Sequence, residues 1–232
     1  MEKGGFNLPF LLFQIAVAVQ CDEDLTHSSK KGVPMLTKLF VGLTFYPDNS
    51  FAKNVESFRS RFDSKYQSTP YLHLPLVPPF EVDANVVKTL ETELIEELES
   101  FYFENTSHHT MKFTGIDVHE YKKNKILYLN PVIDEELNLC QESLFSICKS
   151  YVDRNKRMKD KKTFLTIGRY QEVFDLHSAI ALAQREFHEF ATLPFESICL
   201  FSKNNDSWYR EADLITFDRP ESSLLQNSQA GL

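Results

Sequence analysis

From Lys38 onwards, strand-like and helix-like patterns alternate along the chain, and their order leaves few possible folds. Residues 38–46 (KLFVGLTFY) carry the β-branched and aromatic side chains typical of a strand, and Pro47 stops the run. Apolar residues then recur at helical spacing, and Asn49 or Ser50 is placed to cap that helix. The alternation predicts a sheet covered by helices.

The complete prediction is the order βαβαββαβαββ. Pro78-Pro79 are expected to end the second strand, and Asp83 is expected to cap the second helix. The later strands follow one another as hairpins, which indicates a mixed α+β fold rather than a doubly wound parallel sheet. Each half contains a strand–helix–strand unit, so the halves look like a distant duplication. Strands are expected at residues 38–46, 71–77, 112–121, 126–132, 163–170, 197–201 and 208–217, and helices at 51–62, 86–101, 135–152 and 173–190.

The first 34 residues are expected to lie outside the folded domain. Residues 6–19 (FNLPFLLFQIAVAV) are apolar but too short and too interrupted for a confident membrane span. They have the length of a signal-peptide core, and Cys21 follows where a lipoprotein cysteine would sit, although Gln20 stands in place of a small residue. We therefore interpret residues 1–34 as an export segment or, by preference, an over-extended start, residues 35–218 as one domain, and residues 219–232 as a disordered tail.

The chain is acidic, with a formal net charge of −8 and a pI of about 5.4. This argues against broad non-specific nucleic-acid binding, which needs many Lys and Arg side chains, but it does not exclude a cleft with local cations. The four cysteines lack metal-site spacing, so we expect buried thiols in a reducing compartment. The sequence predicts a cytoplasmic monomer without metal, cofactor or membrane span; an exported lipoprotein is the alternative.

Two short strands each present a pair of residues away from the core. In the segment YLHLPLV the leucines face one side, and His73 and Pro75 face the other, because side chains alternate along a strand. In the segment TFLTIGR the leucine and isoleucine form the core face, and Phe164 and Thr166 face the opposite way. Each strand therefore offers two positions, spaced by two, to a surface away from its apolar face.

These strands resemble the motif strands of the 2H phosphoesterase (2′-5′ RNA ligase-like) superfamily, whose members carry two His-x-(Thr/Ser)-x strands facing each other across a cleft. Here the first motif reads HLPL from His73 and the second FLTI from Phe164. The segments FRSRFDSKYQSTPYLHLPLVPPFE, TFLTIGR and CLFSKNNDSWYREADLITF look like the short bacterial branch, and the resemblance covers residues 39–217. It implies a two-lobed, pseudo-symmetric α+β fold, with antiparallel-rich sheets around a central cleft and helices outside.

The resemblance also implies the chemistry. In the family, one imidazole takes a proton from the attacking oxygen, the other gives one to the leaving oxygen, and the two hydroxyls hold the phosphate. This assigns His73 as an acid or base, and Thr166 as a hydroxyl that donates a hydrogen bond to the phosphate. Phe164 replaces the second histidine and cannot carry a proton, and Pro75 replaces the first hydroxyl. Each acid or base contributes about 10²–10⁴-fold, so hydrolysis at family rates is not expected. Phe164 would instead stack on a base or plug the cleft.

Residues around the motifs are weaker candidates. Arg169 and Lys162 flank the second motif and would supply charge for a phosphate, with exposed surface residues as the alternative. Tyr71 shares the outer face of the first motif, and Tyr128 lies in a strand where family members also place a tyrosine. The basic run 156–162 is interpreted as a solvated loop that could border the cleft. No partner arrangement or ligand set is evident for His108, His109, His119 and His177.

Three functions follow as hypotheses. The first is a degenerate domain that binds a nucleotide or RNA terminus with a cyclic or 2′-5′ phosphodiester and does not turn it over. The second is an active phosphodiesterase that uses His73 and a substitute proton donor. The third is a non-enzymatic structural or lipoprotein interaction domain that keeps only the fold.

Overall fold

The computed structural model describes residues 35–69, 72–101, 109–121, 124–154, 156–158, 163–170, 173–187 and 192–219. All of them lie in the compact unit Pro34–Leu232. The predicted export segment or over-extended start at residues 1–34 lies outside the described residues, as does the predicted tail from residue 220. In chain order the elements are β1 (Leu36–Phe45), α1 (Ser50–Phe62), η1 (Tyr66–Ser68), β2 (His73–Asp83), η2 (Ala84–Val86), α2 (Val87–Ser100), β3 (Thr110–Tyr121), β4 (Asn124–Pro131), α3 (Glu135–Tyr151), β5 (Leu165–Tyr170), α4 (Val173–Glu186), β6 (Thr192–Asn204) and β7 (Ser207–Thr216).

This order of strands and helices confirms the βαβαββαβαββ prediction and the mixed α+β class. The seven described strands form one antiparallel sheet in the order β2-β1-β6-β3-β4-β5, with β7 added to β6. The strand β6 begins earlier than predicted, and this extra length lets it pair with β3 as well as with β1 and β7. The two motif strands, β2 and β5, form the two ends of the path and also approach each other.

The prediction that Pro78-Pro79 end the second strand is wrong, because β2 continues to Asp83. Proline has no N–H to donate to a neighbouring strand. Among the described strands, however, β2 pairs with β1 alone, and an edge strand can direct its proline positions to the unpaired side. The register between β1 and β2 shifts on both sides of Val41, so bulges in β2 absorb the irregularity.

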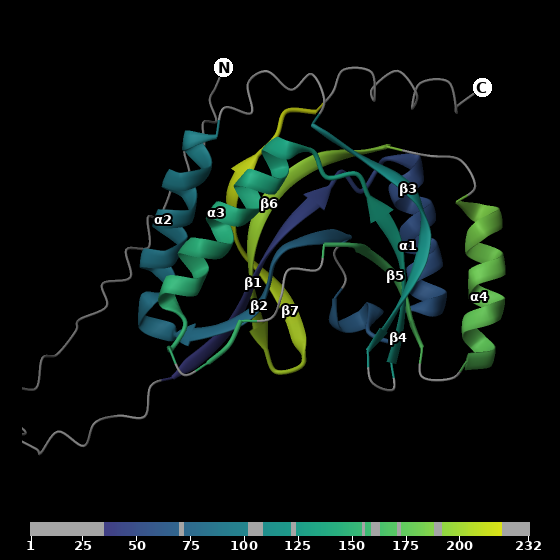
Figure 1. Cartoon of the computed structure of the whole chain (residues 1–232), viewed down its shortest axis with the longest axis horizontal. Helices are drawn as coiled ribbons and strands as arrows, with labels where there is room; N and C mark the ends of the chain where they lie inside the picture. Colours follow the sequence, from purple (N-terminus) through teal and green to yellow (C-terminus); the bar gives the residue numbers. More distant parts are fainter. Residues whose placement is uncertain are drawn as a thin grey trace, which may run out of the picture. The chain divides into compact units, whose positions relative to one another are not determined.

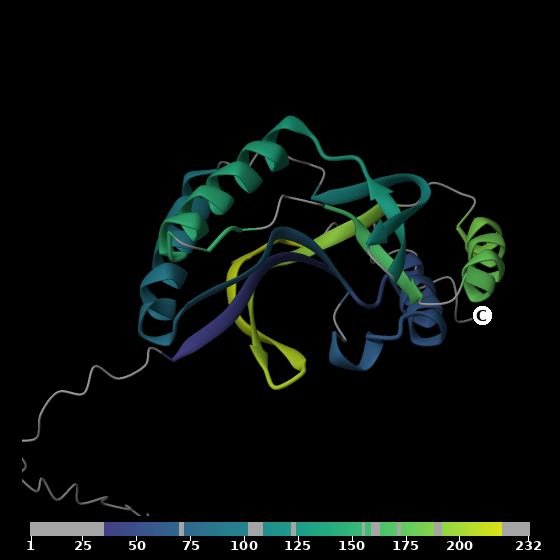
Figure 2. The ribbon, with the colours of Figure 1, turned by 60° about the horizontal axis from the view of Figure 1, so that its bottom comes forward.

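The helices cover the outside of the sheet. In each half of the chain, one helix packs against a motif strand that belongs to the other half. The first-half helix α1 contacts β5, whereas the second-half helix α3 contacts β2 and α2. Figure 1 shows α2 and α3 side by side at one end of the sheet and α1 and α4 at the other, and Figure 2 shows both pairs outside the strands. The expected two-lobed arrangement with helices outside is therefore present.

The core faces of the motif strands agree with the predicted alternation. Leu74 and Leu76 of β2, and Leu165 and Ile167 of β5, are at most 1% exposed and belong to one continuous core cluster. Because successive side chains point to opposite faces, this burial turns the residues between them towards the other side of each strand.

The helix starts follow the predicted caps in one case and depart from them in the other. Asn49 caps α1 by accepting hydrogen bonds from the N–H groups of Phe51 and Ala52. Asp83 instead caps the short turn η2, and α2 begins only at Val87. Among the described helices, none has the length and apolar character needed to cross a membrane.

Candidate active site between the two motif strands

A cavity of about 730 Å³ lies between the motif strands, within the size range of ligand pockets. It brings together five of the predicted site residues, namely His73, Pro75, Phe164, Thr166 and Arg169. Two further candidates, Tyr71 and Lys162, lie outside the described residues. The rest of the described lining is Lys38, Phe40, Lys65, Thr69, Pro78, Pro79, His119, Ile126, Arg157, Met158, Lys203 and Trp208.

His73 is the first residue of β2 and packs against an aromatic floor. Its ring centroid lies 5.0 Å from that of Phe40 and 5.8 Å from that of Phe201, and these two phenyl rings stack on each other at 4.5 Å. The floor exists because residue 42 is glycine: a β carbon there would lie 3.0 Å from the Phe40 ring. His73 therefore has a defined place at the cavity wall, half-buried rather than enclosed in the core.

The opposite wall is built by β5 and its neighbour β4. Thr166 pairs with Tyr128 across these strands, and its hydroxyl makes no hydrogen bond to any described residue. Phe164 stacks on Tyr128, with ring centroids 4.5 Å apart and 29° between the ring planes. Burial and the neighbouring Asp117 carboxylate raise the pKa of Tyr128, whose hydroxyl donates to that carboxylate. Phe164 thus lies against the wall of a cavity that stays open beside it.

Arg169 is fixed at the cavity by a buried carboxylate. Its Nη1 lies 2.6 Å from both oxygens of Asp63, whose side chain is 0% exposed and which ends α1. A second cation, the buried Arg59, lies 3.6 Å from Asp63 and donates to the carbonyl of Thr69, another lining residue. Arg169 therefore presents a fixed positive charge at the cavity.

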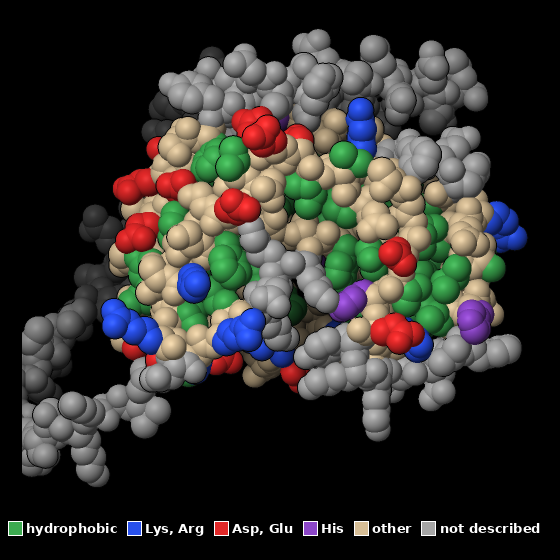
Figure 3. All heavy atoms as spheres, viewed as in Figure 1, with side chains coloured by type: hydrophobic (Ala, Val, Ile, Leu, Met, Phe, Trp, Pro, Cys, Tyr) green, Lys and Arg blue, Asp and Glu red, His purple; other side chains and the backbone are tan. Residues whose placement is uncertain are grey.

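The charges of the cavity are opposite in sign to that of the whole chain. Its described lining contains five Lys or Arg side chains, two histidines and no Asp or Glu. On the face drawn in Figure 3, by contrast, acidic side chains gather over α2 and α3. A protein of net charge −8 therefore keeps a locally cationic hollow, which suits a phosphate-bearing ligand. The five cations are Lys38, Lys65, Arg157, Arg169 and Lys203.

His119 is a lining residue that sequence reasoning missed. It lies on β3, opposite Ile126 of β4, which in turn is opposite Arg169 of β5, so this row crosses three strands on one face. Its ring centroid is 6.0 Å from that of Phe164. The place of His119 depends on the register of three strands, and no local pattern indicates it. The lining lysines Lys38 and Lys203 were missed for the same reason.

A single buried amide links the two motif strands from behind. Gln141 of α3 is 4% exposed, and its Nε2 donates to the carbonyl of Leu76 in β2, 2.8 Å away. The same nitrogen donates to the hydroxyl of Thr163, which lies just before β5. The position of α3 therefore bears on the separation of the two motif strands.

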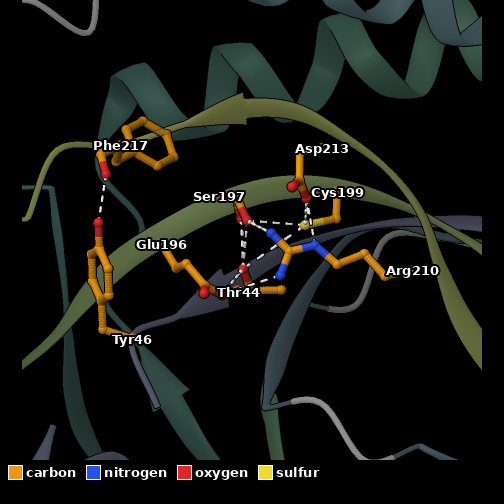
Figure 4. Close-up of polar contacts among 8 residues, drawn as sticks. All are labelled: Thr44, Tyr46, Glu196, Ser197, Cys199, Arg210, Asp213 and Phe217. Atoms are coloured by element: carbon orange, nitrogen blue, oxygen red, sulfur yellow. Dashed lines mark hydrogen bonds and ion pairs between the residues drawn. The ribbon is translucent and has the colours of Figure 1, made fainter. Parts of the chain in front are cut away.

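A polar network supports the sheet beside His73 (Figure 4). Thr44 is directly opposite His73 in the register of β1 and β2. Its hydroxyl lies 2.9 Å from Glu196 Oε2 and 2.8 Å from Ser197 Oγ, both on β6. These contacts tie the strand next to His73 to the middle of the sheet.

The network continues to β7, where Arg210 contacts the same two β6 residues, Glu196 and Ser197, that Thr44 contacts. Arg210 donates to Ser197 Oγ at 2.6 Å and forms ion pairs with Asp213 and Glu196. Cys199 donates to Asp213, and burial raises the pKa of its thiol to about 11. The thiol is therefore protonated near neutral pH, and we interpret the network as structural.

The other predicted residues lie elsewhere. His109 packs on Phe217, and His177 is exposed on α4, so neither lines the cavity. His108 lies outside the described residues, and the basic run is described only at residues 156–158, of which Arg157 and Met158 line the cavity. No group of three or more His, Cys, Asp or Glu side chains suited to a metal occurs in the described parts of the chain.

Comparison with known proteins gives a family match and a distant structural likeness. The family model described as the 2′-5′ RNA ligase superfamily matches residues 47–207, in agreement with the resemblance of the motif strands. Among solved structures, Usb1 of Kluyveromyces marxianus is similar at 13% sequence identity and a TM-score of 0.40, over 75% of this chain and 96% of that chain. No curated protein matches.

Proposed function

Because this chain belongs to the 2′-5′ RNA ligase superfamily, whose model spans residues 47–207, we propose that it binds a nucleotide or RNA end through a phosphodiester in the cleft. His73 approaches this group from β2, and the hydroxyl of Thr166 donates to a phosphate oxygen from β5. Arg169 supplies positive charge. The observation that carries the proposal is the described lining of the cavity, with five cations and no carboxylate.

The proposed role is binding with weak turnover or none. Hydrolysis by paired acid and base needs one group that accepts a proton and another that donates one. Position 164 carries a phenyl ring, which does neither, and position 75 carries a proline without a hydroxyl. Phe164 offers the exposed part of its ring to a base, since every nucleobase has a face that stacks on aromatic side chains.

Calorimetric titration of the full chain with a 2′,3′-cyclic nucleotide and a 2′-5′ dinucleotide tests this proposal. Thr166→Val removes the hydroxyl and keeps the shape, and we expect about tenfold weaker binding, the size of a hydrogen bond to a charged group. Thr114→Val, at an exposed position of β3, is the matched control and should bind like the parent protein. Absence of binding to every nucleotide would favour a structural or interaction domain and contradict the proposal.

A second candidate, an active phosphodiesterase, is favoured by one observation: His119 places another imidazole in the same cavity, beside the phenyl ring of Phe164. In this case water attacks phosphorus and one imidazole accepts its proton. The bond from phosphorus to the ribose oxygen breaks, and the other imidazole protonates that oxygen. The products are a phosphomonoester and a free hydroxyl.

Release of phosphomonoester from a 2′,3′-cyclic nucleotide, followed by chromatography, distinguishes the two candidates. Turnover that disappears in both His73→Ala and His119→Ala, and persists in His177→Ala on the exposed face of α4, supports the active enzyme. Binding without turnover in the parent protein supports the first candidate.

A further inference from the structure

Two lysines lie side by side in the wall of the cavity. Lys38 of β1 is directly opposite Lys203 of β6, and both line the cavity. Like charges directly opposite each other destabilise a strand pair, and a negative group bound between them would remove this repulsion. The described lining offers none.

The carboxylates near these lysines are outside the cavity and compensate them only in part. Glu81 is opposite Lys38 on β2, but it also accepts a hydrogen bond from Lys156 at 2.8 Å. That bond, with a smaller contribution from Lys38, holds the pKa of Glu81 below its usual value. Asp206 lies 3.6 Å from Lys203 and its side chain is fully exposed, so solvent screens that pair. The lysine pair therefore keeps a positive excess on its cavity side.

An aromatic side chain completes the group. Trp208 is opposite Lys203 in the register of β6 and β7, and it also lines the cavity. Its ring stands edge-on to Phe40, with centroids 4.7 Å apart and 85° between the planes. Phe40 packs on His73, so the indole borders the same floor as the motif histidine.

We propose that Lys38, Lys203 and Trp208 form a second phosphate subsite, which makes the ligand an oligonucleotide end and not a mononucleotide. The two lysines hold the phosphate next to the one at His73 and Thr166, and the indole stacks on the neighbouring base. Lys38 is two residues from Phe40 along β1, about 7 Å at the usual strand rise, so the subsite begins beyond the floor under His73. This inference rests on the proposed function of the cleft.

The test compares ligands that differ in length by one nucleotide, and therefore by one phosphate and one base. The full chain is titrated with a nucleoside 2′,3′-cyclic phosphate and with a dinucleotide and a trinucleotide that carry the same 2′,3′-cyclic phosphate end. We expect the dinucleotide to bind at least tenfold more tightly than the mononucleotide. In the double variant Lys38→Gln/Lys203→Gln this advantage should disappear, because the dinucleotide should lose at least tenfold more affinity than the mononucleotide.

A matched double variant separates local contacts from net charge. Lys53→Gln/Lys112→Gln removes the same charge at exposed positions that do not line the cavity, and it should keep the full dinucleotide advantage. Trp208→Leu should reduce the advantage without abolishing mononucleotide binding. The slope of log affinity against log salt for the dinucleotide should fall by about 0.7 in the lysine variant, the value for one lost phosphate contact on a single strand.

Each result has a distinct meaning. Equal affinities for the mononucleotide and the dinucleotide overturn the subsite and leave the proposed function standing. An equal loss in the two double variants also overturns it, because the effect would then come from overall charge. If none of the three ligands binds, the proposed function fails, and the subsite fails with it.

Discussion

Phe40 lies over Gly42 of the same strand, with a ring atom 3.0 Å from the point where a β carbon of residue 42 would be. The ring cannot move aside easily, because it stacks on Phe201 and meets Trp208 edge-on. His73 rests against this ring. The absence of a side chain at residue 42 therefore sets the position of the motif histidine one strand away.

Gly42→Val should consequently destabilise the protein and disturb the cleft. We expect a loss of about 1–3 kcal/mol in the free energy of unfolding, the usual cost of overpacking a filled site. Urea unfolding measures the loss, and nucleotide titration should show weaker binding. The control is Thr114→Val, at an exposed strand position where the same side chain meets solvent. Parent-like stability of Gly42→Val would contradict this account of the floor.

Restoring the two lost motif residues should create activity. Phe164→His and Pro75→Thr together return the second imidazole and the first hydroxyl to positions that already line the cavity. Hydrolysis of a 2′,3′-cyclic nucleotide should rise by about 10²–10⁴-fold over the parent protein, the contribution of one acid or base. His73→Ala in this background should remove the gain. An unchanged rate would mean that the motif strands do not present these positions to a common phosphate.

Asp63→Asn should be among the most damaging single substitutions. Asp63 is buried and accepts hydrogen bonds from Arg169. Its loss leaves the Arg59 guanidinium, 2% exposed, with Glu56 as its one charged partner among the described residues. Breaking such a buried pair costs about 3 kcal/mol. Glu120→Gln, which removes the exposed partner of Lys125, should not change the urea midpoint measurably. Asp63→Asn should also bind nucleotides less tightly than the parent protein, since Asp63 orients Arg169.

The buried thiols should resist alkylation in the native state. Burial first, then the nearby Glu97 and Glu136, raises the pKa of Cys140 to about 12, and burial also raises the pKa of Cys148. A thiol with a raised folded-state pKa contributes stability that is complete below its unfolded pKa, about 8.5, and is lost as the pH rises through the folded value. Iodoacetamide labelling at pH 8, read by peptide mass spectrometry, should spare both cysteines until urea unfolds the protein. Rapid native labelling would show that these helix faces open.

Much of the fold was predictable because its signals are local. The apolar spacing gave the order of the elements, and the period of two in YLHLPLV and TFLTIGR gave the buried face of each motif strand. The end of β2 was predicted wrongly, because the missing N–H of proline was taken as sufficient to end a strand. Whether Pro78 can stay in a strand depends on that strand being at an edge, which is a property of the whole sheet.

Only part of the site could be predicted from the sequence, because the rest also depends on how the strands pair. The motifs indicated His73 and Thr166, but His119 and the Lys38–Lys203 pair come together only through strand pairing. Lys38 and Lys203 belong to strands at opposite ends of the chain, and no spacing rule connects them. Their charges would have suggested separate solvated positions.

The exchange of helices between the two halves has a consequence for how such a protein can be divided. The strand β2 is covered by α3, which is made after β4, and β5 is covered by α1, which is made before β2. A fragment made of one half of the chain would contain one motif strand without the helix that covers it, and would contain instead the helix that covers the other motif strand. We therefore expect the two halves of the chain to behave as complementing fragments that must associate to fold, so that neither motif strand is fully covered until the halves have come together.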